Sequence, residues 1–353
     1  MTLTDRLSAF EKLGSFLAQF STGNFKKNDC PDDDTKYFDA FSMQVKRQKE
    51  FNSWFTLDQI TYACKNWSES LTISNLNKWT KSYTLDKNIT KTVAVIMAGN
   101  IPLVGFHDFL SALIAGHKVL VKQSHNDKHL LPLLAKYLEF LNPKFKDLIR
   151  FTEGKLDHFD AVIATGSNNT ARYFDYYFGK YPHIIRKNRN SVAVLTGNET
   201  EKELSSLGED IFRFFGLGCR SVSKLFIPKD YDFDNLFKAI YPYKELISYT
   251  KYQNNYDYNK AVYLMSEFKL LENGFLMLKE DPSYASPIAT LFYEYYDDLV
   301  ALNKTLSFDK DKIQCIVSSD VSIKKAVAFG KTQQPYLWDY ADDVDTLAFL
   351  ESL

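Results

Sequence analysis

The chain has 353 residues, of which 45% are hydrophobic and 25% charged, a composition typical of soluble globular proteins with a large buried core. Its 43 Lys and Arg residues nearly balance 44 Asp and Glu residues, so the formal net charge is only -1. This balance argues against a general electrostatic attraction to nucleic acid or to an anionic membrane. We therefore expect no nucleic-acid partner.

The cysteines are few and widely separated, at Cys30, Cys64, Cys219 and Cys315. They form no CxxC pair, which favours reduced thiols over a disulfide framework or a zinc site. We therefore expect a cytoplasmic protein without a bound metal.

The first 85 residues are predicted to be mainly helical, with a polar loop at KKNDCPDDDTKYF. The first 20 residues have the spacing of an amphipathic helix, and they lack the basic start and the continuous apolar run of a signal peptide. The apolar positions are Leu7, Phe10, Leu13, Phe16, Leu17 and Phe20. No later segment approaches the roughly 18 to 20 apolar residues that span a bilayer, so we expect no membrane span.

From Lys91 the pattern changes to short β-branched runs that alternate with helical stretches. The expected strands are TVAVIMA, KVLVKQ and DAVIATG, and the expected helices are HDFLSALIAG, HLLPLLAKYLEFL and NTARYFDYYFG. This alternation predicts βαβ units in a parallel, Rossmann-type sheet that is covered on both faces. We place this first α/β domain at residues 86–190, after the helical region 1–85.

A second α/β domain is predicted at residues 191–330. It contains the expected strands SVAVLTG, SKLFIP and IQCIVSS, the helix EKELSSLGEDIFRFFG, and a final helix around SIKKAVAFG. The tail, residues 331–353, has mixed polar and aromatic composition. We expect it to pack on the first domain or on a neighbouring subunit.

Cys219 follows Gly216 and Gly218 in FFGLGCRS, just before the strand SKLFIP. Glycine adopts positive φ and allows close approach to the backbone, so this segment is suited to presenting a thiol. On this observation alone, a buried cysteine that acts as a small apolar residue is the simpler alternative.

Asn100 lies in MAGNIPLVGF, directly after an expected strand. A fixed side-chain amide is a suitable donor to the oxyanion of a tetrahedral adduct, and the backbone N–H of Cys219 would be the second donor. The alternative is that Asn100 only closes its own turn.

Two further segments end expected strands with polar residues. Lys122 and Ser124 lie at the carboxyl end of KVLVKQ, where open parallel sheets hold nucleotides, although a strand-end lysine is often simply solvated. Gly166 and Ser167 precede a helix, whose N-terminus favours phosphate but also needs an ordinary N-cap. The chain has no GxGxxG, GxxxxGK[ST] or HExxH motif.

The order and spacing of three segments resemble the aldehyde dehydrogenase superfamily, and the segments are IPLVGFHDFLSALIAGHKVLVKQS, DAVIATGS and SVAVLTGNETEKELSSLGEDIFRFFGLGCRSVSKLFIP. The chain more closely resembles the LuxC-like branch of long-chain acyl-CoA reductases, in RKNRNSVAVLTGNET, FGLGCRSVSKLFIP and LWDYADDVDTLAFL, and the resemblance runs from about Lys91 to the C-terminus. It implies an aldehyde-dehydrogenase-like α/β fold in which residues 86–190 bind a nicotinamide cofactor and residues 191–330 carry the nucleophile. By the same resemblance, Cys219 is the thiol nucleophile and Asn100 the oxyanion-hole amide.

The resemblance also assigns cofactor contacts. Lys122 and Ser124 match the adenosine-ribose contacts of the family, and Gly166 and Ser167 match its pyrophosphate turn. Members that prefer NAD place a carboxylate just after the Lys-x-Ser, whereas this chain has His125. Because that carboxylate would repel a 2′-phosphate, its absence favours NADPH, with NADH as the alternative.

A second departure concerns the reaction. Hydrolytic members use a glutamate to activate water against the acyl-enzyme, but the matching stretch here, IIRKNRNS, contains no carboxylate. A long-lived thioester favours reduction of an acyl-CoA to an aldehyde. The alternatives are an aldehyde dehydrogenase that oxidises aldehydes and a non-catalytic acyl-carrier or scaffold subunit.

The resemblance further implies an acyl-CoA or acyl-carrier thioester as substrate, a homo-oligomer, and an acyl-protein synthetase as a partner. His107 and His183 are candidates for proton transfer, with a plain surface role as the alternative for His183. Arg186 and Arg189 either contact phosphate or form structural ion pairs.

Overall fold

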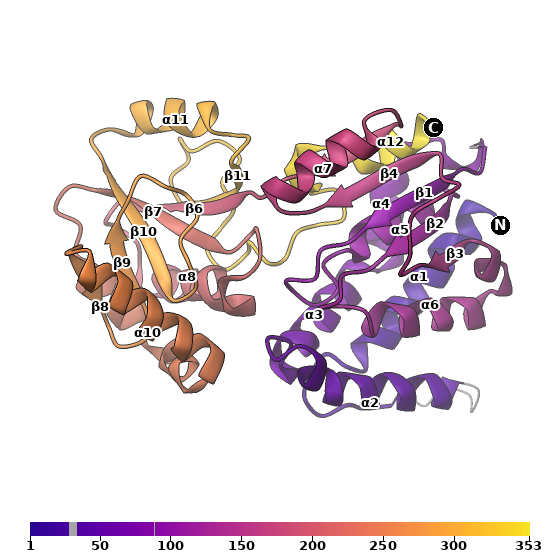
Figure 1. Ribbon diagram of the computed structural model, residues 1–353, viewed down its shortest axis with the longest axis horizontal. Coiled ribbons are helices and arrows are strands. Elements are labelled where there is room, and N and C mark those ends of the chain that lie inside the picture. The colour runs from indigo at the N-terminus through magenta and orange to yellow at the C-terminus, as the bar shows by residue number, and fades with distance from the viewer. Residues whose placement is uncertain (28–33, 88) are drawn as a thin grey trace. The chain divides into compact units, whose positions relative to one another are not determined.

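The computed structural model describes residues 1–27, 34–87 and 89–353 (Figure 1). The chain divides into two compact units: unit 1 comprises Met1–Lys187 and Tyr336–Leu353, and unit 2 comprises Asn188–Pro335. Cys30 lies outside the described residues.

Unit 1 contains a five-stranded sheet in which every pairing is parallel, in the order β3-β2-β1-β4-β5. The strands are β1 (Thr92–Ile96), β2 (Lys118–Lys122), β3 (Ile149–Phe151), β4 (Ala161–Thr165) and β5 (His183–Arg186). This confirms the Rossmann-type parallel sheet that the strand-helix alternation predicts. The chain runs outward from β1 to β3 and then returns to β4, so the strand order reverses between β1 and β4. In open α/β sheets, ligands bind at the carboxyl ends of the strands where this reversal occurs.

The helices of unit 1 include four that precede the sheet. They are α1 (Leu3–Ala18), α2 (Thr35–Phe51), α3 (Leu57–Ser70), α4 (Ile73–Thr80), α5 (Phe106–Ile114), α6 (Leu130–Leu141), α7 (Asn168–Phe178) and α12 (Thr346–Glu351). The first four confirm the predicted helical N-terminal region.

Alternate residues of β1 face opposite sides of the sheet, as strand geometry requires. Val93 and Val95 belong to the large core formed with the N-terminal helices, α5 and α6. Ala94 faces the other side, where it packs in a smaller cluster with Ala164 of β4 and with Phe174 of α7. The sheet is therefore buried on both faces, which explains its nearly continuous apolar strands.

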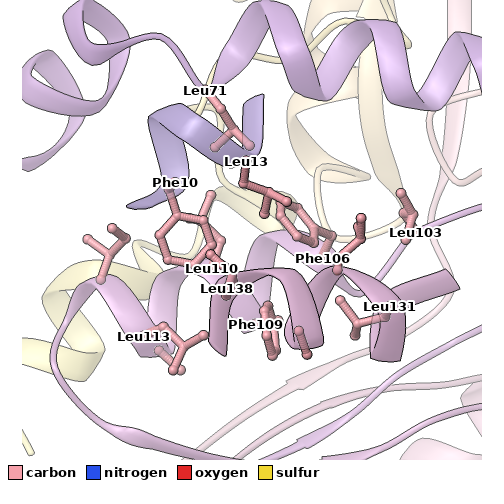
Figure 2. Packing of buried hydrophobic residues seen from close by; sticks show 14 of the residues in the cluster. Phe10, Leu13, Leu71, Leu103, Phe106, Phe109, Leu110, Leu113, Leu131 and Leu138 are labelled. Atoms are coloured by element: carbon pink, nitrogen blue, oxygen red, sulfur yellow. The ribbon is translucent and has the colours of Figure 1, made fainter. Parts of the chain in front are cut away.

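The large core depends on the apolar face of α1. All six predicted apolar positions of this segment are buried. Figure 2 shows Phe10 and Leu13 of α1 together with Phe106 and Phe109 of α5. Burying one such side chain contributes about 1.5 to 3 kcal/mol, so α1 is an integral part of unit 1.

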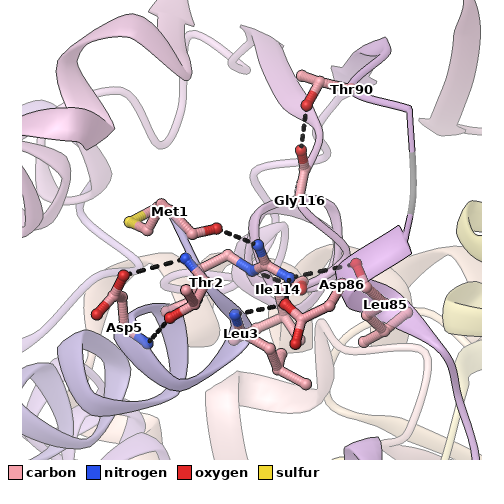
Figure 3. A network of polar contacts seen from close by, with 10 residues as sticks. Met1, Thr2, Leu3, Asp5, Leu85, Asp86, Thr90, Ile114 and Gly116 are labelled. Atoms are coloured by element: carbon pink, nitrogen blue, oxygen red, sulfur yellow. Dashed lines mark hydrogen bonds and ion pairs between the residues drawn. The ribbon is translucent and has the colours of Figure 1, made fainter.

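A buried arginine also fixes α1. The Arg6 guanidinium donates to the carbonyl oxygens of Ile114 at 3.0 Å and Met1 at 2.8 Å, and it pairs with Asp86 at 3.6 Å (Figure 3). Gly116, with φ +88°, follows α5, and a Cβ there would meet Arg6 Nη1 at 3.2 Å. The turn after α5 is thus shaped around the guanidinium, although burial lowers the pKa of Arg6.

The C-terminal segment completes unit 1. Helix α12 packs on α5, and Leu347 and Leu350 are fully buried in the large core. The ring of His117 bridges backbone groups far apart in sequence: Nδ1 accepts from the Lys91 N–H at 3.1 Å, and Nε2 donates to the Leu350 carbonyl at 2.8 Å. These contacts tie α12 to the starts of β1 and β2.

Unit 2 contains a six-stranded sheet in the order β11-β6-β7-β10-β9-β8, parallel except for the pair of β8 and β9. Its strands are β6 (Asn190–Val194), β7 (Val222–Pro228), β8 (Leu270–Glu272), β9 (Met277–Glu280), β10 (Thr290–Tyr296) and β11 (Ile313–Val317). Its helices are α8 (Glu201–Phe212), α9 (Phe233–Ile240), α10 (Thr250–Met265) and α11 (Leu299–Phe308). Helices α8 and α9 cover one face, and α11 contributes to the cluster on the other.

The helix predicted around SIKKAVAFG is wrong. Residues 321–331 form turns, and Val327 pairs with Val317 as an isolated parallel bridge next to β11. The Val327 N–H donates to the Ile316 carbonyl at 2.7 Å, and Lys325 has φ +58°. Hydrogen bonds to the sheet therefore replace the local helical bonds that the sequence favours.

Candidate active site

Five predicted site residues of unit 1 lie on one edge of its sheet. Asn100 follows β1, Lys122 ends β2 and Ser124 follows it, and Gly166 and Ser167 follow β4. Because β1 pairs in parallel with both β2 and β4, these strands end at the same edge. This edge includes the reversal of strand order between β1 and β4, so the residues occupy the position at which such sheets bind nucleotides.

The loops after β1 and β2 are in close contact. A Cβ at Gly99 would lie 2.6 Å from both Cβ and Oγ of Ser124, closer than real Cβ contacts. Gly99 is thus required by the position of Ser124, and the loop that carries Asn100 packs directly on the loop that carries Ser124. Asn100 itself is exposed.

Lys122 is partly buried, and its side chain is oriented by the protein. Its Nζ donates to the Gly154 carbonyl at 2.9 Å, in the loop that follows β3. The ammonium group therefore stays at the carboxyl edge of the sheet. His125, in the turn after Ser124, is exposed.

Ser167 is the N-cap of α7. Its Oγ accepts from the Thr170 N–H at 3.2 Å, as an N-cap side chain does, and the phosphate contact of this turn stays a prediction. A Cβ at Gly166 would meet the Thr170 and Phe174 side chains at 3.0 to 3.1 Å, which shows how closely α7 approaches the end of β4. A helix N-terminus at this edge is electrostatically suited to a phosphate group.

The stretch IIRKNRNS holds no carboxylate, and its first arginine is used structurally. Arg186, at the end of β5, is 6% exposed and pairs with Asp108 of α5 at 2.5 Å. Its second terminal nitrogen donates to Thr346 Oγ1 at 3.0 Å. The ion-pair alternative is confirmed for Arg186, whereas Arg189 donates to the Lys310 carbonyl of unit 2 at 3.1 Å.

The two candidate histidines are engaged elsewhere. His107 Nε2 donates to the Leu337 carbonyl at 2.9 Å, so this ring holds the C-terminal segment. His183 is exposed at the start of β5, and because the strands are parallel this is the edge opposite to Asn100. Neither position supports a role in proton transfer.

In unit 2, α8 leads to the nucleophile candidate through a left-handed turn. The helix starts with a capping box in which Thr200 Oγ1 accepts from the Glu203 N–H at 3.2 Å and the Glu203 carboxylate accepts from the Thr200 N–H at 2.8 Å. After α8, Phe214, Phe215 and Gly216 have φ values of 54°, 57° and 74°. Such conformations cost about 1 to 3 kcal/mol for each non-glycine residue and persist only where packing enforces them.

That packing is visible around the two phenylalanines. Both are buried, and the Phe215 ring stacks on Tyr249 with a centroid distance of 4.8 Å. The turn redirects the chain, so that Cys219 follows on a tight turn rather than on a continuation of α8. In the sequence, only Gly216 indicates backbone with positive φ at this turn, because phenylalanine rarely adopts positive φ.

Cys219 is exposed on a turn that is fixed at both ends. Its carbonyl accepts from Ser191 Oγ at 2.9 Å, and the Ser221 N–H donates to the Gly218 carbonyl at 2.9 Å. The buried-cysteine alternative is thus wrong for Cys219. Cys64 and Cys315, by contrast, are buried. Burial raises the pKa of the Cys64 thiol to about 12, so this thiol is unreactive at neutral pH.

Asp127 is a residue at the unit 1 edge that the sequence did not point to. It is 7% exposed, and its Oδ2 accepts from the Leu103 N–H at 2.8 Å. Burial raises its pKa to about 7. The available signal was an acidic residue three positions after Ser124, which on its own is typical of any polar turn.

Within the described ranges, no group of three or more His, Cys, Asp or Glu side chains is arranged to hold a metal ion. Within the same ranges, no helix has both the length and the apolar character needed to cross a bilayer.

The fold is that of aldehyde dehydrogenases. Aldehyde dehydrogenase 21 from Physcomitrella patens, solved with the reaction product succinate, matches with TM-score 0.65 and 13% identity over 92% of this chain and 75% of that chain. Betaine aldehyde dehydrogenase from Staphylococcus aureus in complex with NAD+ matches with TM-score 0.59 and 11% identity over 89% of this chain and 72% of that chain. An aldehyde dehydrogenase from Bacillus cereus, in its NAD+ complex, matches with TM-score 0.57 and 12% identity over 89% of this chain and 72% of that chain.

The sequence family gives the more specific result. No curated protein sequence matches the chain. The family model described as acyl-CoA reductase (LuxC) matches residues 20–236, which is more than half of the chain and includes Asn100 and Cys219. The chain therefore belongs to the LuxC family of acyl-CoA reductases and is an oxidoreductase of acyl or aldehyde groups.

Proposed function

We propose that the protein reduces a long-chain fatty acyl-CoA, or the thioester of an acyl carrier, to the aldehyde with NADPH, through an acyl group held on Cys219. The observation that carries this proposal is the exposed thiol of Cys219 on its constrained turn in a member of the LuxC family. An oligomeric assembly and an acyl-protein synthetase partner are part of the same proposal, because the family resemblance implies them.

The first step is attack of the Cys219 thiolate on the carbonyl carbon of the acyl thioester. A C–S bond forms to Cys219, and the CoA thiolate leaves as the tetrahedral adduct collapses. Asn100 and the Cys219 backbone N–H donate to the oxyanion of that adduct. The hydrogen bond from Ser191 to the Cys219 carbonyl fixes the peptide plane beyond the nucleophile during this step.

The edge of the unit 1 sheet is suited to a nicotinamide cofactor. Lys122 and Ser124 would contact the adenosine ribose, and Gly166 and Ser167, at the start of α7, would hold the pyrophosphate. The NAD+ complexes of the S. aureus and B. cereus aldehyde dehydrogenases support a cofactor of this class. A bound nicotinamide cofactor would supply hydride to the carbonyl carbon of the Cys219 thioester. The anionic thiohemiacetal held on Cys219 would then collapse as its C–S bond breaks, which would release the aldehyde and restore the Cys219 thiolate.

The missing carboxylate supports reduction over hydrolysis. Residues 184–191 contain no carboxylate that could activate water, and the Arg186 guanidinium is occupied by Asp108 and Thr346. An acyl-enzyme without a general base nearby is hydrolysed slowly. The thioester on Cys219 therefore persists until hydride is available.

The Cys219→Ser substitution tests the nucleophile. We expect the variant to lose NADPH-dependent reduction of long-chain acyl-CoA and to keep its thermal stability, because serine is a far weaker nucleophile without a base. Cys64→Ala is the control, since it removes a buried thiol whose pKa is raised to about 12 by burial. A Cys219→Ser variant with more than about a tenth of the normal rate would contradict the assignment.

Labelled acyl-CoA separates this function from the alternatives. We expect the wild-type protein to take up one acyl label, to lose it as aldehyde when NADPH is added, and to produce little free acid. An acyl carrier would keep its label after NADPH is added. An oxidising aldehyde dehydrogenase would instead convert aldehyde and NADP+ to free acid without needing CoA.

A further inference from the structure

Asp127 connects the two loops that carry Asn100 and Ser124. Its carboxylate accepts from the Leu103 N–H in the loop after β1, with Oδ2 2.8 Å from the nitrogen. Its own N–H donates to the Ser124 carbonyl at 3.1 Å, and its carbonyl accepts from Gln123 Nε2 at 3.1 Å. One buried residue therefore holds the loop after β1 and shapes the loop after β2.

Leu103 is in a conformation that needs such support. It has φ +58°, which is uncommon for a residue with a branched side chain, and its side chain is 3% exposed within the large core (Figure 2). The hydrogen bond to Asp127 is thus a contact that keeps residues 99–103 in a strained turn. Asn100 lies three residues earlier in that turn.

The other side of the same loop is equally constrained. A Cβ at Gly99 would come within 2.6 Å of the Ser124 side chain and within 3.2 Å of the Asp127 nitrogen. The backbone on both sides of Asn100 is therefore positioned against residues 124–127: Gly99 by direct contact and Leu103 by the carboxylate.

We propose that Asp127 is a positioning residue that holds the Asn100 loop against the Ser124 loop, so that the oxyanion donor and the cofactor-binding loop form one unit. This rests on the proposed function for the roles of Asn100 and Ser124, but the mechanical connection itself does not.

The contact between Asp127 and the loop after β1 depends on pH, because the Asp127 carboxyl ionises near neutral pH. Oδ1 has no hydrogen-bond partner among the described residues, and burial outweighs the Leu103 N–H so that the pKa of Asp127 is raised to about 7. The charged side chains on neighbouring elements are directed elsewhere: Lys122 to the Gly154 carbonyl and Lys128 to Glu153 at 3.7 Å. Exposed His125 lies in the same turn. Because burial favours the protonated carboxyl, the contribution of Asp127 to holding the loop is lost as the pH rises through about 7, where the carboxyl ionises in its buried position.

Hydrogen exchange tests the connection without any substrate. We expect Asp127→Ala to speed amide exchange in residues 97–105 by about tenfold, whereas Asp127→Asn, which keeps an acceptor oxygen, restores most of the protection. Asp160→Ala is the matched control, because Asp160 accepts from the Thr92 N–H at 2.7 Å at the opposite end of β1. Equal exchange of residues 97–105 in wild type, Asp127→Ala and Asp160→Ala would overturn the inference.

Kinetics test the consequence for catalysis. For acyl-CoA reduction we expect Asp127→Ala to lower kcat about 10- to 100-fold with a smaller change in KM, and Asp127→Asn to recover most of that loss. The rate ratio of wild type to Asp127→Asn should fall several-fold from pH 6 to pH 8, because only the wild type ionises a buried carboxyl in this range and ionisations common to both proteins cancel in the ratio. A flat ratio together with an unchanged kcat in Asp127→Ala would overturn the inference. Absence of acyl-CoA reduction by the wild type would refute the proposed function instead, and the exchange measurement would still decide the role of Asp127.

Discussion

His125 lies next to the proposed ribose contacts of Lys122 and Ser124. It is exposed in the turn after Ser124, where NAD-preferring members of the superfamily carry a carboxylate. We expect His125→Glu to raise the KM for NADPH about tenfold or more, through repulsion between a carboxylate and the 2′-phosphate, and to favour NADH. Steady-state kinetics with both cofactors measure this shift. His125→Gln is the control, because it removes the ring without adding charge, and an identical effect of both substitutions would exclude the electrostatic explanation.

Asn100 is exposed on the loop after β1, as an oxyanion donor must be. We expect Asn100→Ala to lower kcat about 100-fold or more with little change in KM, since the lost hydrogen bond forms mainly in the transition state. Asn126→Ala, an exposed asparagine in the next loop, controls for loss of an amide at this edge. If the Asn100→Ala rate is unchanged, Asn100 only closes its turn.

At the scale of residues, the sequence predicted positions better than contacts. It placed Asn100, Lys122, Ser124, Gly166 and Ser167 at strand ends because strands and turns are local patterns. It did not predict that Arg186 pairs with Asp108, because those residues are 78 positions apart and only the fold brings them together. Asp127 was missed for the same reason, since its role depends on an N–H from another loop.

Helix α8 and the left-handed turn form the element that presents Cys219. Its position against the rest of unit 2 is set partly by Gly208, where a Cβ would lie 2.2 Å from the Tyr243 ring. The Tyr243 hydroxyl donates to Glu209 at 2.7 Å, and its ring packs on Phe212 with centroids 4.9 Å apart. The ring therefore has little freedom to move aside.

Gly208→Ala tests this contact. Alanine would favour the helix by up to about 1 kcal/mol, but overpacking against a held ring costs about 1 to 3 kcal/mol. We therefore expect lower stability in urea unfolding. Lys202→Ala, at an exposed position of the same helix, is the control for propensity. In a Tyr243→Ala background the same substitution should cost less, because the clash is gone, and strict additivity would contradict the explanation.

At the scale of elements, the sequence predicts the helices and strands whose apolar residues recur at regular spacing. It does not predict segments whose conformation depends on hydrogen bonds or packing with distant residues. Helices α5, α6 and α8 and strands β1, β2 and β4 were predicted from apolar spacing alone. The segment 322–330 was predicted as a helix and is not one, because Val327 hydrogen-bonds to β11. The turn at Phe214 and Phe215 was not predictable, since packing enforces backbone angles that their side chains disfavour.

The two units are the largest level of organisation. The sequence pattern separates residues 1–85 from the first sheet, whereas in the structure these helices share the core of unit 1. Apolar spacing reveals that α1 has a face to bury, but not which surface will cover it. The same is true of the C-terminal helix, whose contacts connect residues more than 200 positions apart.

His117 makes the stability of unit 1 depend on pH. Burial lowers the pKa of this ring, so below about pH 6.5 the unfolded chain binds a proton that the folded chain resists. Above that pH the ring is neutral in both states, and its contribution to the free energy of unfolding is complete. As the pH falls, this contribution is lost. The raised pKa of Asp127 acts in the opposite direction, so the effect of His117 has to be isolated by substitution.

The His117→Gln substitution isolates the contribution of His117 to the pH dependence of stability. We expect wild type to exceed His117→Gln in free energy of unfolding by about 1 kcal/mol or more at pH 7.5, because at least one buried hydrogen bond is lost. The difference should shrink toward pH 5. Urea unfolding at several pH values measures it, and His183→Gln, which removes an exposed ring, serves as control. A difference that is constant across this range would show that His117 does not titrate in the accessible range.

The division of unit 1 into two chain segments has a consequence for biosynthesis. Unit 2 lies between these segments in the sequence, so the ribosome needs roughly 10 to 30 seconds to make it before Tyr336 and the following residues emerge. Until then the nascent chain lacks Leu347 and Leu350 of the core and Thr346 beside Arg186. Unit 2 can therefore complete its folding before unit 1 does. The segment Met1–Lys187 keeps apolar core surface exposed until Tyr336–Leu353 has been synthesised.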